Sequence, residues 1–99
     1  MKNIILLGSN AARFEKELHK SFEVKKVTVK KFPDGETYVR IPQRLNEVDI
    51  VYLQCFFPNQ NDSLIESFFT LDVLEDHNCH VKGIIVPYFP YARQDKKFL

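Results

Sequence analysis

Residues 49–55 read DIVYLQC, and this stretch is the strongest indication of the fold class. Its apolar side chains are nearly continuous rather than alternating, which is typical of a strand that is covered on both faces. Strands of this kind belong to sheets that carry helices on either side. The stretch therefore predicts a central strand of an α/β domain.

The flanking sequence extends this pattern in both directions. Residues 4–7 (IILL) and residues 82–87 (KGIIVP) are short apolar runs that predict two further strands. Apolar residues at helical spacing predict helices over residues 11–22 and residues 63–76. The alternation predicts a three-layer α/β fold, with a mostly parallel sheet and helices on both of its faces.

The expected start of each helix carries side chains that can cap it. Ser9 or Asn10 can accept an orphan backbone N–H of the first helix. Ser63 and Glu66 fit a capping box at the second helix, although residues 61 and 62 (Asn-Asp) could equally supply the cap.

A β-hairpin is predicted between the first helix and the central strand. Residues 24–32 alternate in character but are rich in lysine, which favours an exposed or edge strand. Residues 33–36 (PDGE) form a turn signal, with proline at a central position and glycine where a positive φ is needed. Residues 37–41 return as a strand, so the hairpin would project from the main sheet as a flag. The lysines either protect this edge from aggregation or form an anion-binding patch.

The turn of this hairpin carries an aromatic ring and two carboxylates. An adenine base needs a flat apolar surface for stacking and an acceptor for its exocyclic amine. Phe32 can supply the surface, and Asp34 or Glu36 can supply the acceptor. The alternative is an ordinary turn in which Phe32 packs on the core.

A second candidate site follows the last predicted strand. Residues 87–97 read PYFPYARQDKK, a stiff aromatic segment that ends in hydrogen-bond donors. Open α/β sheets bind ligands at the carboxyl ends of their strands. Arg93 could grip a polyphosphate there and Gln94 could add a neutral donor. The alternative is a charged, frayed terminus.

Composition excludes several classes of function. The 99 residues suffice for one small domain or part of a larger one, and the net charge of +1 does not suggest nucleic-acid or membrane-surface binding. No apolar run approaches the roughly 20 residues that span a bilayer. Cys55 and Cys79 form no Cys-x-x-Cys motif, so free thiols in a reducing cytoplasm are expected. Residues 77–80 (HNCH) could hold a metal, but a polar helix end is the simpler interpretation.

Three blocks of this sequence together resemble ribose-phosphate pyrophosphokinases, also called phosphoribosyl pyrophosphate synthetases. The blocks are the hairpin, residues 61–66 and residues 87–96, and the resemblance covers essentially the whole chain. The matching residues are Phe32, Asp34, Gly35, Glu36, Val39, Arg40, Ile41, Asn61, Asp62, Leu64, Glu66, Pro87, Tyr88, Tyr91, Ala92, Arg93, Gln94, Asp95 and Lys96.

The resemblance implies a phosphoribosyltransferase-like fold and a cytoplasmic kinase of nucleotide biosynthesis. Members of the family transfer the diphosphoryl group of ATP to ribose 5-phosphate and use Mg²⁺. Phe32, Asp34 and Glu36 would contact adenine in the site of a neighbouring subunit, which implies a homo-oligomer. Arg93 and Gln94 would contact the ATP phosphates.

The resemblance also implies that residues 1–99 form only part of an N-terminal domain, without the C-terminal domain. The metal-binding histidine, the mobile catalytic loop and the loop for ribose 5-phosphate have no counterpart here. The 99-residue chain alone is therefore expected to be inactive. The alternatives are a non-catalytic oligomerisation or regulatory module related to the synthetase, or a truncated product without function.

Overall fold

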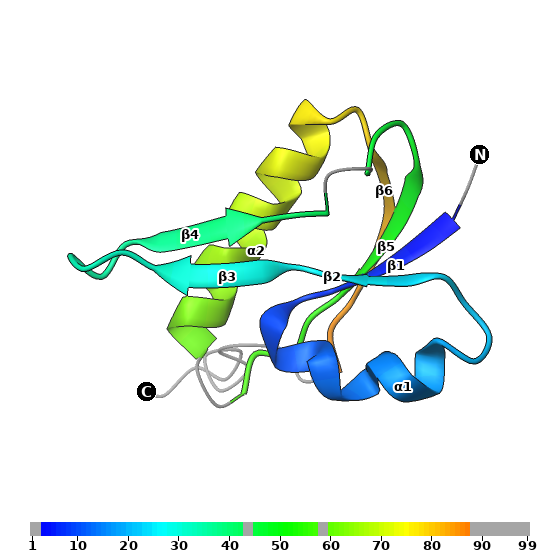
Figure 1. Ribbon diagram of the computed structural model, residues 1–99, viewed down its shortest axis with the longest axis horizontal. Helices are drawn as coiled ribbons and strands as arrows, with labels where there is room; N and C mark the ends of the chain where they lie inside the picture. Colours follow the sequence, from blue (N-terminus) through cyan, green and yellow to red (C-terminus); the bar gives the residue numbers. More distant parts are fainter. Residues whose placement is uncertain (1–2, 43–44, 58–59, 88–99) are drawn as a thin grey trace, which may run out of the picture.

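The computed structural model describes residues 3–42, 45–57 and 60–87 (Figure 1). In chain order the elements are β1 (Asn3–Leu7), the 3₁₀ helix η1 (Ser9–Phe14), α1 (Glu15–Leu18), β2 (Val24–Lys26), β3 (Thr28–Lys31), β4 (Thr37–Arg40), β5 (Asp49–Leu53), α2 (Gln60–Asp76) and β6 (His80–Ile85). Within these ranges no helix has both the length and the apolar character needed to cross a membrane.

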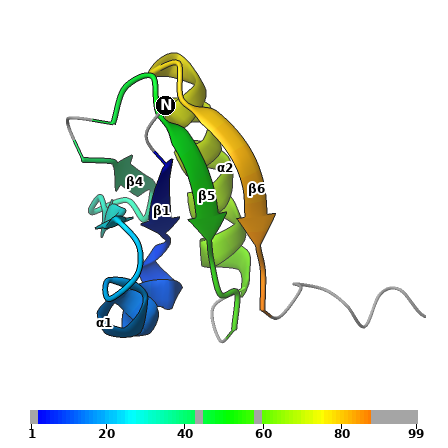
Figure 2. The ribbon, with the colours of Figure 1, turned by 90° about the vertical axis from the view of Figure 1, so that its right-hand side faces the viewer.

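The main sheet has four strands in the order β2-β1-β5-β6, and all neighbouring pairs are parallel. The predicted central strand is β5, which lies between β1 and β6 (Figure 2). Its side chains Ile50 and Tyr52 are almost fully buried. The predicted α/β fold with a mostly parallel sheet is confirmed, because a buried apolar run of this kind satisfies its backbone only between two other strands.

Helices cover both faces of this sheet. On one face α2 packs over β5 and β6, with Leu74 fully buried against the sheet (Figure 2). On the other face Ala11, Phe14 and Leu18 of η1 and α1 pack against a smaller cluster. The larger core cluster consists of Ile4, Leu6, Val27, Ile41, Leu45, Ile50, Tyr52 and Leu74.

The first helical segment differs from its prediction. A single helix over residues 11–22 was expected, but the chain forms η1 and then a short α1 that ends at Leu18. Phe22 was expected on the buried face, yet its side chain is 56% exposed. A further helical turn would therefore gain no apolar burial, and short helices depend on such packing for their stability.

The lysine-rich segment is divided between two sheets, which the prediction of one strand over residues 24–32 missed. β2 forms the edge of the parallel sheet, whereas β3 pairs with β4 in the hairpin. The chain passes from one sheet to the other at Val27. The Val27 N–H donates to the Leu7 carbonyl at 2.9 Å and its side chain is buried. This buried residue fixes the point at which the hairpin leaves the sheet.

The predicted helix caps are wrong. The N-cap position of η1 is Gly8 and carries no side-chain cap, so neither Ser9 nor Asn10 has that role. Helix α2 begins at Gln60, and Ser63 therefore lies inside the helix rather than at its start. These polar side chains are instead used in a network between elements, which is described with the site.

Gly8 provides the first test of this packing. A Cβ at Gly8 would overlap the side-chain amide of Gln54, which is fully buried and donates a hydrogen bond to Glu66. We expect Gly8→Ala to lower the free energy of unfolding by about 1–3 kcal/mol, the usual cost of overpacking. At Gly83 an added Cβ meets nothing within 4 Å, so Gly83→Ala is the control in urea denaturation. Equal effects of the two substitutions would contradict the packing described.

Tyr52 provides a test that depends on pH. Burial, together with the negative charge of Glu66, raises the pKa of Tyr52 from 10.0 to about 12. The folded chain therefore keeps this proton between these pH values while the unfolded chain loses it. The stability that the protonated Tyr52 hydroxyl contributes is fully present below about pH 10 and is lost as the pH rises toward 12. The free energy of unfolding should fall by up to about 2–3 kcal/mol over this interval.

Urea denaturation at pH 9 and at pH 11.5 measures this effect. Tyr52→Phe removes the titrating hydroxyl, while Ser67 keeps its hydrogen bond to the Ser63 carbonyl at 2.8 Å. We expect the wild-type chain to lose more stability than Tyr52→Phe over this interval. An identical loss in both proteins would show that Tyr52 titrates normally.

Candidate functional site

The predicted hairpin is present and projects from the body of the molecule (Figure 1). β3 and β4 are antiparallel, with Lys30 opposite Tyr38 and Lys31 opposite Thr37. Near its base, Val29 and Val39 pack against the larger core cluster. The hairpin is thus attached by its base, and its turn extends outward.

The turn has the geometry that its sequence predicts. The Gly35 N–H donates to the Phe32 carbonyl at 2.8 Å, and the Phe32 N–H donates to the Glu36 carbonyl at 2.8 Å. Gly35 has a φ of +93°, which a residue with a side chain rarely adopts. Pro33 and Asp34 occupy the two central positions, where proline presets the required φ.

The three predicted adenine-binding residues all lie at this turn and are exposed. The Phe32 ring is 49% exposed and meets the Tyr38 ring edge-on, with centroids 5.6 Å apart. It belongs to neither core cluster, so the alternative that Phe32 packs on the core is wrong. Asp34 accepts the Glu36 backbone N–H at 3.0 Å through Oδ1, which fixes the turn.

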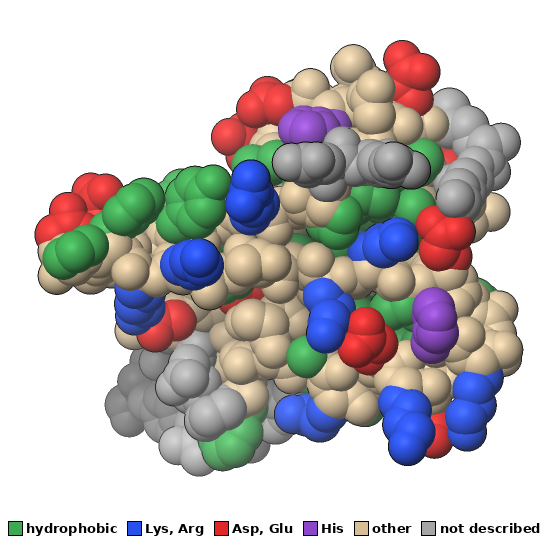
Figure 3. Space-filling model, viewed as in Figure 1, with side chains coloured by type: hydrophobic (Ala, Val, Ile, Leu, Met, Phe, Trp, Pro, Cys, Tyr) green, Lys and Arg blue, Asp and Glu red, His purple; other side chains and the backbone are tan. Residues whose placement is uncertain are grey.

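Acidic and basic side chains are separated along the hairpin. Figure 3 shows acidic and hydrophobic side chains at its outer end and basic side chains closer to the body. One end therefore offers a ring for stacking and carboxylate acceptors, which is a combination suited to a purine with an exocyclic amine.

An open groove separates the outer part of the hairpin from α2. Its volume is about 440 Å³, and its walls are Gly35, Glu36 and Thr37 on one side and Asp62, Ile65 and Phe69 on the other. Ile65 and Phe69 are 44% and 45% exposed. The turn is therefore not packed on the helix, and Glu36 faces a space that a ligand or another chain can enter.

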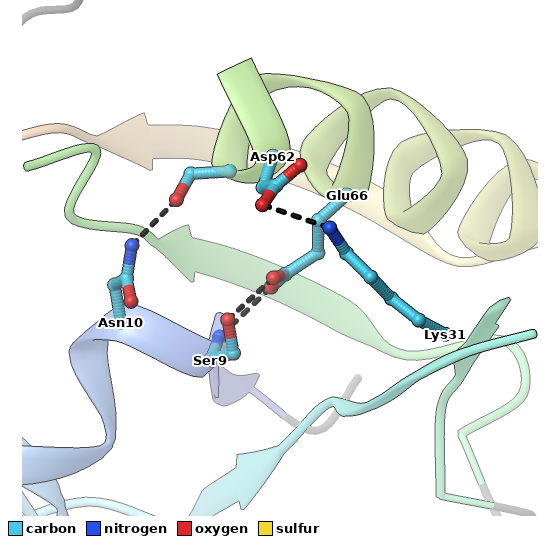
Figure 4. A network of polar contacts seen from close by, with 6 residues as sticks. Ser9, Asn10, Lys31, Asp62 and Glu66 are labelled. Carbon is cyan, nitrogen blue, oxygen red and sulfur yellow. Dashed lines mark hydrogen bonds and ion pairs between the residues drawn. The ribbon is translucent and has the colours of Figure 1, made fainter. Parts of the chain in front are cut away.

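A buried polar network lies where the carboxyl ends of β1 and β5 meet, and the sequence analysis did not predict it (Figure 4). Glu66 is only 3% exposed. Its carboxylate accepts the Ser9 backbone N–H at 2.8 Å, the Ser9 hydroxyl, and the Gln54 amide at 2.8 Å. The Asn10 side-chain amide donates to the Ser63 hydroxyl. Helix α2 is thereby bound to the loops that follow both strands.

This position is the topological switch point of the sheet. From β1 the chain crosses outward to β2, and from β5 it crosses in the other direction to β6. Ligands of open α/β sheets bind in the crevice at such a point. Here Glu66 and Gln54 occupy the crevice, and no buried side-chain nitrogen or oxygen among the described residues lacks a partner. The sequence signal was the polar Gln54 within the nearly continuous apolar run of residues 49–55.

Two further residues, Arg93 and Gln94, were predicted to bind the ATP phosphates. Arg93 and Gln94 lie outside the described residues, so their role stays a prediction. The strand before them was predicted over residues 82–87 and is β6, His80–Ile85. Its carboxyl end adjoins that of β5, because the two strands are parallel.

The histidines and cysteine near the end of α2 make separate contacts. His77 Nδ1 lies 3.1 Å from the Leu45 carbonyl, and His80 Nδ1 lies 3.4 Å from Asp49 Oδ1. Across the described ranges no three His, Cys, Asp or Glu side chains are grouped so that they could hold a metal ion. The alternative of a metal site at residues 77–80 therefore has no support here.

Comparison with known proteins identifies relatives along the whole chain. Residues 4–98 match the family of the N-terminal domain of ribose phosphate pyrophosphokinase. The ribose-phosphate pyrophosphokinase of Sulfolobus acidocaldarius is 37% identical over 98 residues, which are 96% of this chain and 34% of the relative. That of Pyrococcus abyssi is 35% identical over 96 residues, which are 97% of this chain and 33% of the relative.

A solved structure agrees with these matches. The phosphoribosylpyrophosphate synthetase of Mycobacterium smegmatis superposes with a TM-score of 0.74 at 33% identity, over 97% of this chain and 33% of the other. The chain thus spans about a third of the length of the relatives it matches. It belongs to the ribose-phosphate pyrophosphokinase family and corresponds to the N-terminal domain of its members.

Proposed function

We propose that this chain is the adenine-binding N-terminal part of an enzyme that transfers diphosphate from ATP to ribose 5-phosphate. The product, phosphoribosyl pyrophosphate, would serve nucleotide biosynthesis. Membership of the family supports this assignment, and one structural observation carries it. A half-exposed aromatic ring and two carboxylates lie together on a hydrogen-bonded turn that stands away from the core.

The turn suggests a division of roles among its side chains. The Phe32 ring would stack on the adenine, as aromatic side chains do with any base. Glu36 is the better acceptor for the exocyclic amine, because Asp34 Oδ1 already accepts the Glu36 N–H. Asp34 would then act mainly by keeping the turn in shape, which orders the other two side chains before the nucleotide binds.

The phosphates and the metal would be held elsewhere. Arg93 and Gln94 are proposed to contact the ATP phosphates, since a guanidinium matches phosphate oxygens in charge and geometry. Mg²⁺ is proposed to arrive with ATP, because this ion is commonly bound through substrate phosphates. The described residues include no group of three His, Cys, Asp or Glu side chains that could hold the ion.

Assembly and location are proposed on the same basis. The hairpin carries its turn away from its own sheet, which favours contact with the site of a neighbouring subunit in a homo-oligomer. Cys55 and Cys79 are free thiols, as expected in the cytoplasm. The net charge of +1 gives no reason to propose a nucleic-acid or membrane partner.

One observation favours the non-catalytic module as a second candidate. Helix α2 exposes several large apolar side chains, and exposed apolar surface of this kind is typical of protein interfaces. The residues are Ile65, Phe68 and Phe69, which are 44%, 58% and 45% exposed. A module that associates through this surface would need neither ATP nor a complete active site.

Titration of the chain with a non-hydrolysable ATP analogue and Mg²⁺ tests the proposed function. We expect Phe32→Leu to weaken binding about tenfold, because stacking of one base on an aromatic ring is worth about 1–3 kcal/mol. Phe22 is 56% exposed and lies outside the hairpin, so Phe22→Leu is the control and should leave the affinity unchanged.

The outcomes separate the two candidates. Equal affinities of the wild type, Phe32→Leu and Phe22→Leu would contradict adenine binding by the hairpin. A folded chain that associates with itself but binds no nucleotide would favour the module. Synthesis of phosphoribosyl pyrophosphate by the 99 residues alone would contradict the proposal that they are only part of the enzyme.

A further inference from the structure

The outer part of the hairpin is poorly supported by apolar packing, which raises the question of what holds its turn in place. The groove of about 440 Å³ separates Gly35, Glu36 and Thr37 from α2. A smaller pocket of about 160 Å³ lies on the inner side, between Val29, Lys31 and Thr37 of the hairpin and the residues of the polar network. The hairpin and the helix are thus separated by two hollows at this level.

An ion pair spans the space between these two hollows. Lys31 Nζ lies 3.0 Å from Asp62 Oδ2 (Figure 4). Lys31 is the last residue of β3 and directly precedes Phe32, the proposed adenine-stacking residue. Asp62 lies in the first turn of α2 and lines both hollows.

The helical partner of this pair is held firmly in position. Ser63 and Glu66, one and four residues after Asp62, are bound to the loops after β1 and β5. Asp62 and Glu66 are also like charges at a spacing of four residues, which disfavours a helix unless counter-charges or donors compensate them. Donors from Ser9 and Gln54 compensate Glu66, and Lys31 compensates Asp62.

We propose that Lys31 and Asp62 are positioning residues that set the hairpin turn for nucleotide binding. The pair ties the residue before Phe32 to a helix end that the buried network keeps fixed. It acts through Phe32 and Glu36 and need not touch the nucleotide. This inference rests on the proposed adenine-binding role of the turn, but its structural part can be tested without any nucleotide.

The effect of the pair should be measurable but modest. Its side chains are 53% and 59% exposed, and exposed pairs of this kind are weak and are screened by salt. We therefore expect changes of about twofold to fivefold rather than a loss of function. The matched control is Lys30→Met, because Lys30 is an exposed neighbour on the same strand and makes no ion pair with any described residue.

Amide hydrogen exchange of the whole chain tests the structural part. We expect Lys31→Met and Asp62→Asn each to speed exchange of the Gly35 and Glu36 amides about twofold to fivefold at low salt. The double variant should exchange no faster than either single variant, because one interaction is lost in all three. Unchanged exchange, or independent effects that multiply in the double variant, would overturn the proposal.

Affinity for the ATP analogue tests the functional part. We expect the same two variants to bind it about twofold to fivefold more weakly, with the difference disappearing in about 1 M salt. The swapped pair Lys31→Asp with Asp62→Lys should recover part of the affinity. The positioning role would be overturned if Lys31→Met and Asp62→Asn bind the analogue as tightly as the wild-type chain and the Lys30→Met control do. A wild-type chain that binds no nucleotide would instead contradict the proposed function, and hydrogen exchange would still decide the role of the pair.

Discussion

The buried carboxylate of Glu66 is the interaction on which the arrangement of this domain depends. It receives hydrogen bonds from Ser9 and Gln54, which follow β1 and β5. Burial of an ionised carboxylate is costly unless donors satisfy it, and here several donors converge on it. The bonds therefore determine how α2 lies against the ends of both strands. Gly8 is part of the same arrangement, because only glycine leaves room for the Gln54 amide.

The candidate site follows from this arrangement. The network fixes the N-terminal end of α2, and that end holds the hairpin through Asp62 and Lys31. The hairpin leaves the parallel sheet at the buried Val27, and its turn is shaped by Gly35 and by the Asp34 side chain. The domain thus places a small group of an aromatic ring and carboxylates well outside its core. A group placed in this way can act on a ligand or in a site that another part of the assembly completes.

Structural features that depend on local sequence pattern were predicted correctly. Features that depend on contacts between distant residues were not. The apolar run of β5 and the turn at Gly35 were predicted correctly, because each depends on its own residues. The caps at Ser9 and Ser63 were predicted wrongly, since those side chains bind partners more than fifty residues away. The length of the first helix was overestimated because helical spacing does not show that Phe22 lacks a surface to pack on. The residues predicted to bind adenine do lie together at an exposed turn, and their binding role stays a prediction. The Lys31–Asp62 pair joins residues 31 positions apart and has no local signal.

Urea denaturation of Glu66→Ala measures how much the buried Glu66 carboxylate contributes to the free energy of unfolding. The control is Glu75→Ala, because Glu75 is an exposed carboxylate on the same helix. The loss of Glu66 removes the acceptor of the Ser9 donors and leaves the fully buried Gln54 amide without its carboxylate partner, so we expect a loss of about 2–4 kcal/mol. Glu75→Ala should change stability by less than about 0.5 kcal/mol. An equally small effect of both substitutions would contradict the claim that the Glu66 carboxylate holds the strand ends and α2 together.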